Sequence, residues 1–124
     1  MSLLQRLWIY QSERFPLLSH SVLVLALTLG VSGFASAGVG WPSPARMVGA
    51  FAAAFGFFML LRISDEFKDA ADDAAFRPYR PVPRGLVTLR QLAGVGVVVI
   101  VVQLAITLLL GWALLPYLLA VWLM

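Results

Sequence analysis

Residues 47–63 read MVGAFAAAFGFFMLLRI, an apolar run with a single charged residue, Arg62, near its end. A helix that crosses a bilayer needs about 17–25 mostly apolar residues, so this run predicts a membrane-spanning helix. Alanine or glycine occupies positions 49, 50, 52, 53, 54 and 56. Small residues at these positions would let a second helix approach closely within the membrane.

The overall composition supports a membrane protein. The chain has 124 residues, of which 61% are hydrophobic and 12% charged, and its mean hydropathy is +0.92. Soluble proteins average roughly 45–50% apolar and about 25% charged residues, so this composition excludes an ordinary cytosolic domain. The absence of cysteine excludes disulfide scaffolds and thiolate metal sites, and the single histidine, His20, excludes a histidine-rich one.

Two further apolar runs follow the same logic. Residues 17–39 and 92–110 predict complete spans, residues 113–124 begin a fourth, and residues 1–16 predict an interfacial helix. We therefore expect an all-α polytopic transmembrane helix bundle with three complete spans and the start of a fourth. A secretory signal peptide cleaved near residues 35–37 is an alternative for the first span. The long polar region before it and the second span close behind it argue against that alternative.

Basic residues predict the orientation of the bundle. The connection over residues 62–90 carries six lysines and arginines, the amino terminus adds Arg6 and Arg14, and the 40–46 turn carries only Arg46. Basic residues favour the cytoplasmic side of a membrane. We expect an integral protein of a bacterial inner membrane whose N-terminus and 64–91 loop are cytoplasmic. The net charge of +3 is attributed to this rule, and nucleic acid is not an expected partner.

The stretch RISDEFKDAADD (62–73) holds five of the six acidic residues. If it continues the second span as a helix, its five carboxylates share an arc of about 120°, whereas Lys68 points away from that arc. Like charges so close repel one another and favour a bound cation. Oxygen ligands without histidine or cysteine favour Mg²⁺ or Ca²⁺. The alternative is a solvated helix end whose acids are balanced by the bases of the loop.

The next stretch, FRPYRPVPRG (76–85), combines three prolines with three arginines. The prolines forbid a helix and predict an extended and then turning backbone. Arginine forks on such a rigid segment suit phosphate groups. An acidic, cation-binding face next to this loop would therefore fit a diphosphate, although positive-inside arginines in a stiff loop explain the pattern equally well.

Together, DEFKDAADDAAFRPYRPVPRG resembles the first aspartate-rich motif of the UbiA superfamily of intramembrane prenyltransferases, NDxxDxxxD followed by an arginine–proline pair and a Pro-(Ser/Arg)-Gly turn. Asp65 falls at the asparagine, and Glu66, Asp69 and Asp73 fall at the three aspartates. The resemblance implies a partial UbiA-like bundle that binds Mg²⁺, an isoprenyl diphosphate and a lipophilic acceptor among membrane lipids. It implies transfer of the prenyl group to an acceptor that is commonly aromatic.

The candidate site follows from this resemblance. The predicted metal ligands are Asp69, Asp73, Glu66 and Asp65, the first two being the principal ones. The predicted diphosphate contacts are Arg80 and Arg84, followed by Arg77 and Lys68. The family's second aspartate-rich motif does not occur in the chain, so we expect residues 1–124 to be a fragment that is inactive alone.

The sequence is also compatible with other functions. A non-catalytic membrane protein that binds or conducts divalent cations is the main alternative, and a purely structural membrane subunit is another. The polar Gln103 within the third span is expected to bond a neighbouring helix or to face a substrate cavity. His20 is expected to be a satisfied interfacial side chain.

Overall fold

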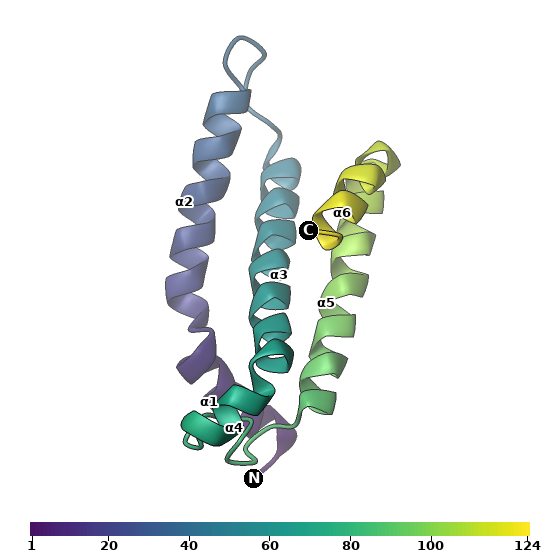
Figure 1. Cartoon of the computed structure of the whole chain (residues 1–124). Coiled ribbons are helices and arrows are strands. Elements are labelled where there is room, and N and C mark those ends of the chain that lie inside the picture. The colour runs from purple at the N-terminus through teal and green to yellow at the C-terminus, as the bar shows by residue number, and fades with distance from the viewer.

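The computed structural model describes all residues 1–124 and contains only helices. Figure 1 shows the long helices side by side, with shorter helices at their ends. In chain order the helices are α1 (Leu3–Arg14), α2 (Leu17–Ala35), α3 (Pro44–Lys68), α4 (Ala70–Phe76), α5 (Leu89–Leu110), the 3₁₀ turn η1 (Trp112–Leu114) and α6 (Leu115–Trp122). Helices α2, α3 and α5 are long and apolar enough to cross a membrane. The all-α class and the three candidate spans are as predicted.

Two ends of the bundle can be distinguished. Helices α1 and α4 and the loop over residues 77–88 lie together at one end, which we call the polar end (Figure 1). The 36–43 turn between α2 and α3, together with η1, lies at the other end, which we call the distal end. Because α2, α3 and α5 are joined by these turns, consecutive long helices run antiparallel.

Helix boundaries follow from capping residues. Ser2 with Gln5 and Thr88 with Gln91 form capping boxes that start α1 and α5. Ser43 accepts a hydrogen bond from the backbone nitrogen of Arg46, and Pro44 takes the first helical position of α3. The second span therefore begins before residue 47, and the turn that the sequence placed at 40–46 lies at 36–43. The first span ends earlier than residue 39, because α2 gives way to a turn with Gly38 and Gly40 at positive φ.

Small residues allow α3 and α5 to pack closely. Gly49 and Gly56 of α3 are both buried. A Cβ atom added at Gly56 would lie 3.1 Å from Val99 Cγ1 and 3.2 Å from Gln103 Cγ, so this side of α3 has no room for a larger residue without movement. At Gly49 the added atom would meet Leu110. The close approach that the alanine and glycine positions allow is therefore formed with α5.

A buried polar link joins three helices at mid-bundle. The Gln103 side chain on α5 is 1% exposed. Its Nε2 donates to the Ala53 carbonyl of α3 over 2.8 Å, and its Oε1 accepts from Trp122 Nε1 of α6 over 2.9 Å. Of the two alternatives for Gln103, the structure shows the hydrogen bonding to neighbouring helices. The link turns α6 back toward α3 and α5, as Figure 1 shows.

The apolar core of the polar end lies under α1. Tyr10 of α1 is buried against Ile63 of α3, Val87 of the loop and Leu92 of α5. His20 stacks on Phe15 with ring centroids 4.0 Å apart, and its Nδ1 lies 3.0 Å from the Pro16 carbonyl oxygen. The histidine is therefore satisfied by its neighbours, as expected. This packing holds α1 across the base of α3, where the acidic stretch begins.

Candidate functional site at the polar end

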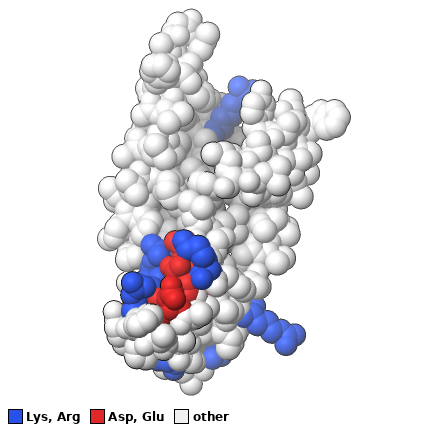
Figure 2. Space-filling view, viewed as in Figure 1, with Lys and Arg blue, Asp and Glu red and all other residues white.

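Charged residues are strongly segregated along the bundle. All six acidic residues and every lysine and arginine except Arg46 belong to α1, the end of α3, α4, the 77–88 loop or the start of α5. Figure 2 shows a compact acidic patch near one end of the molecule, bordered by basic side chains. The polar end therefore carries nearly all the charged side chains of the chain.

The acidic stretch is helical, as predicted. The backbone nitrogen of Asp69 donates to the Asp65 carbonyl over 2.9 Å, and that of Asp73 donates to the Asp69 carbonyl over 2.8 Å. Asp69 itself has φ −93° and ψ 4°, which separates α3 from α4. Helical hydrogen bonding thus continues across a local distortion, and positions 65, 69 and 73 follow one another along the same side.

The five carboxylates of this stretch differ widely in exposure. Glu66 and Asp73 are buried, with 1% and 2% of their surface exposed, whereas the side chains of Asp65 and Asp69 are 44% and 35% exposed. Asp72 is fully on the surface and makes no ion pair within 4.0 Å. The helical wheel placed these residues correctly around α3, but it could not show that α1 and the loop cover two of them.

Glu66 is held by the amino-terminal helix. Its Oε1 accepts from Arg14 Nε over 2.6 Å and lies 3.5 Å from the Tyr10 hydroxyl. Burial, and next the charge of Glu66, raise the pKa of the Tyr10 hydroxyl above its usual value. Sequence reasoning missed this triad because Glu66 lies more than fifty residues from Tyr10 and Arg14. The buried position of Glu66 makes it an anchor for α1 in this structure.

Asp73 is held by the proline–arginine loop. Arg80 Nη1 lies 2.7 Å from both Asp73 carboxylate oxygens, and Arg77 Nη1 lies 3.0 Å from one of them. The hydrogen bond from Arg80, with a further one from Arg77, lowers the pKa of the Asp73 carboxyl despite its burial. The same bond raises the pKa of Arg80. Asp73 is therefore ionised and organises the start of the loop.

Arg84 is tied to α1 rather than to the acidic stretch. Its two Nη atoms bind the two carboxylate oxygens of Glu13 over 2.9 and 2.8 Å, and Nη1 also donates to the Tyr79 carbonyl. The hydrogen bond from Arg84 lowers the pKa of Glu13. The loop is a series of turns, because the backbone nitrogens of Arg80 and Arg84 donate to the carbonyls of Arg77 and Arg80. The extended backbone predicted from the prolines is not formed.

Of the four predicted metal ligands, Asp65 and Asp69 are the ones whose carboxylates remain accessible. Lys68 Nζ lies 3.5 Å from Asp65 and 3.9 Å from Asp69, so the two carboxylates face one ammonium group. The prediction that Lys68 points away from the acids is wrong, since its long side chain curls back toward them. The ammonium occupies the kind of position between two carboxylates that a metal cation would take.

The donor set at Asp65 and Asp69 suits Mg²⁺. This ion takes oxygen ligands, commonly one or two carboxylates, and fills its other positions with water and phosphate oxygens. No three acidic or histidine side chains gather closely enough to hold a metal ion by themselves. Binding of Mg²⁺ by these two residues would therefore leave positions for a phosphate ligand. The roles predicted for Glu66 and Asp73 as metal ligands stay predictions.

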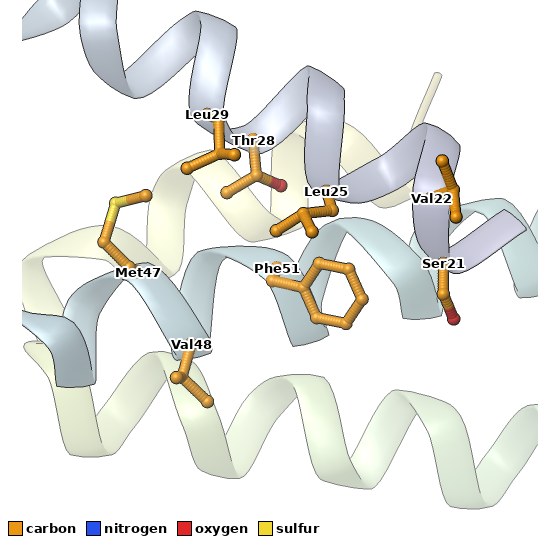
Figure 3. Close-up of a pocket in the computed structure, with 8 residues that line it drawn as sticks. All are labelled: Ser21, Val22, Leu25, Thr28, Leu29, Met47, Val48 and Phe51. Carbon is orange, nitrogen blue, oxygen red and sulfur yellow. The ribbon is translucent and has the colours of Figure 1, made fainter. Parts of the chain in front are cut away.

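An apolar cavity lies between the middle of α2 and the start of α3. It has a volume of about 370 Å³, and Figure 3 shows its lining side chains projecting from the two helices. The lining residues are Ser21, Val22, Leu25, Thr28, Leu29, Met47, Val48 and Phe51. Its walls are almost wholly hydrocarbon, so this cavity fits an aliphatic chain and not a charged group.

Comparison of the chain with protein-family models, with curated proteins and with solved structures finds no match.

Proposed function

We propose that the chain belongs to a UbiA-like, magnesium-dependent intramembrane prenyltransferase, which moves an isoprenyl group from its diphosphate to a lipophilic, aromatic acceptor. The observation that carries the proposal is the segregation of charge: three apolar helices of spanning length end in a single cluster of carboxylates and arginines. An isoprenyl diphosphate is divided in the same way, into an apolar chain and a charged head. The motif residues 65–85 make up most of that cluster.

The proposed orientation follows from the same segregation. Basic residues gather at the polar end, which the positive-inside rule assigns to the cytoplasm. We accordingly place the N-terminus and the 77–88 loop on the cytoplasmic face of a bacterial inner membrane. The diphosphate would then enter from the cytoplasm while its hydrocarbon chain lies among the helices.

Asp65 and Asp69 are the proposed magnesium ligands. Of the four predicted metal ligands they are the two accessible ones, and Lys68 already neutralises part of their charge. Magnesium bound there would act as a Lewis acid that stabilises negative charge on the departing diphosphate. Lys68, released from the two carboxylates, is within reach to pair with a phosphate oxygen instead.

Arg80 and Arg77 are the proposed diphosphate contacts. In each of them only Nη1 is hydrogen bonded, and its partner is Asp73. An arginine has five N–H donors, so both guanidinium groups keep unused donors for phosphate oxygens. Arg84 is less available, because both of its Nη atoms bind Glu13. Asp73 thus serves as a positioning residue that holds two phosphate-binding groups beside the proposed metal site.

The main alternative, a protein that binds or conducts divalent cations without catalysis, has weaker support. Ion pathways through membranes are lined by ionisable residues that face the bundle interior. Helices α2 and α5 contain no acidic residue, and the acids of α3 lie only in its last turn. The buried Gln103 already hydrogen bonds to Ala53 and Trp122.

Binding of farnesyl diphosphate to the chain in lipid nanodiscs tests the proposal. Asp69→Asn should weaken magnesium-dependent binding by at least about tenfold, because it removes a charged ligand. Asp72→Asn is the matched control, since it removes the same charge from an exposed neighbour without an ion pair, and it should stay within about twofold of wild type. Equal effects of the two substitutions, or binding that ignores magnesium, would overturn the assignment.

A further inference from the structure

The largest cavity of the molecule lies at the distal end, far from the acidic stretch. It has a volume of about 840 Å³ and is bounded by the end of α2, the 36–43 turn, the start of α3 and the end of α5 with η1. This volume falls in the range of small-molecule sites, roughly 300–1,000 Å³. The residues of its lining that carry polar groups include Ser32, Ser36, Trp41, Ser43, Arg46 and Thr107.

Arg46 is the only basic side chain at this end. Figure 2 shows basic atoms set back between the two arms of the bundle there, remote from the acidic patch. The Arg46 side chain forms no ion pair or side-chain hydrogen bond, whereas Arg14, Arg77, Arg80 and Arg84 all bind carboxylates. No acidic residue occurs between positions 14 and 64, so the local sequence offers no anion to this guanidinium.

Two further features make the distal cavity favourable for negative charge. The cavity lies at the amino-terminal end of α3, where the helix dipole is positive, and the first turn of α3 contains no acidic residue to offset it. The serine side chains of the α2–α3 turn add hydroxyl donors to the same wall. The remaining wall is apolar, with Met47, Ile106 and Leu110 among its residues. The cavity thus combines one unpaired cation, neutral donors and hydrocarbon.

We propose that the distal cavity binds the phosphate headgroup of an anionic phospholipid, with Arg46 as its cationic contact and the acyl chains against the apolar wall between α3 and α5. The planar guanidinium can bind phosphate oxygens in a two-pronged manner. The lipid is favoured over free phosphate because most of the cavity wall is hydrocarbon. The site takes a lipid from the leaflet opposite the polar end and is independent of the diphosphate site.

Native mass spectrometry of the detergent-solubilised chain with phosphatidylglycerol tests this assignment. Wild type should retain one phosphatidylglycerol in preference to zwitterionic phosphatidylcholine. Arg46→Gln should reduce that binding by at least about tenfold, because it removes a charge-assisted hydrogen bond. Arg90→Gln is the matched control, since Arg90 is another exposed arginine without an ion pair but lies at the start of α5, and it should bind as wild type does.

Each outcome decides the proposal. Selective retention that is lost only in Arg46→Gln supports it. Equal losses in both variants would show a general attraction between arginines and lipid. Equal retention of the two lipids would show no preference for the anionic headgroup. Either result overturns the site. Millimolar inorganic phosphate added as a competitor separates the two sources of the ligand: displacement of the lipid would assign the cavity to free phosphate instead. A circular dichroism spectrum unchanged by Arg46→Gln confirms that the fold is intact.

Discussion

Replacing Glu66 by glutamine should destabilise the bundle far more than the same loss of charge one residue earlier. The Glu66 side chain is 1% exposed and accepts a 2.6 Å hydrogen bond from Arg14, which is itself only 15% exposed. Removing one member of a buried ion pair leaves the other charge uncompensated and costs about 3–5 kcal/mol. Because Arg14 keeps some access to water, we expect Glu66→Gln to lower the free energy of unfolding by about 3 kcal/mol, the low end of that range.

The matched control is Asp65→Asn. The Asp65 side chain is 44% exposed, and its contacts with Arg62 and Lys68 are 3.9 and 3.5 Å long. Exposed ion pairs of this kind contribute about 0–1 kcal/mol, so the free energy of unfolding should fall by less than about 1 kcal/mol. Both variants lose one negative charge within the same turn of α3, so a difference between them measures burial and pairing.

Unfolding of each variant in mixed micelles with increasing sodium dodecyl sulfate, followed by circular dichroism, gives these free energies. The Arg14→Gln variant and the Arg14→Gln/Glu66→Gln double variant complete a cycle, which should show a coupling of about 1–3 kcal/mol. Accessibility of the 14–15 peptide bond to trypsin in Glu66→Gln reports release of α1 directly. Equal destabilisation by Glu66→Gln and Asp65→Asn, or a coupling near zero, would refute the anchoring role of Glu66.

Two further predictions concern helix packing and the loop. Gly56→Ala should lower the free energy of unfolding by about 1–2 kcal/mol, because its Cβ would crowd Val99 and Gln103. Gly94→Ala, whose Cβ would meet nothing within 4 Å, should raise the free energy of unfolding by about 0.5–1 kcal/mol through helix propensity. The same detergent titration measures both variants, and changes of the same sign would contradict the close α3–α5 contact. Because the pKa of Asp73 is depressed in the folded state, its stabilisation of the 77–88 loop should be complete above the ordinary carboxyl pKa near 4 and should be lost as the pH falls through the depressed value. Hydrogen exchange of the loop should show this loss in wild type and not in Asp73→Asn. A wild-type loop whose exchange does not change in acid would contradict the stabilising pair of Arg80 and Asp73.

Much of the fold was predictable from local sequence. The apolar runs identified α2, α3 and α5, because span length and hydropathy are properties of contiguous residues. The alanines after Lys68 favoured the helical continuation into α4, and the small residues of α3 marked the side that meets α5. Helix ends were less accurate, because a single capping side chain such as Ser43 moves a boundary by several residues.

The candidate site was only partly predictable. The wheel correctly gathered the carboxylates near the end of α3, but their exposure depends on α1 and on the 77–88 loop, which lie far away in sequence. Glu66 pairs with Arg14, and Glu13 pairs with Arg84, seventy-one positions later. Local patterns carry no information about such partners. The capping box of α1 and the basic residue in its last turn were available as signals of a helix, although not of its contacts.

In the proposed function, the polar end binds the head of an isoprenyl diphosphate through magnesium. The most direct measurement is isothermal titration of the wild-type chain in nanodiscs with farnesyl diphosphate, in magnesium and in excess chelator, beside farnesol as a probe with the same hydrocarbon chain and no diphosphate. Farnesyl diphosphate should bind saturably only when magnesium is present, and farnesol should bind at least about tenfold more weakly. Equal binding of the two compounds, or farnesyl diphosphate binding that persists unchanged in chelator, would contradict it.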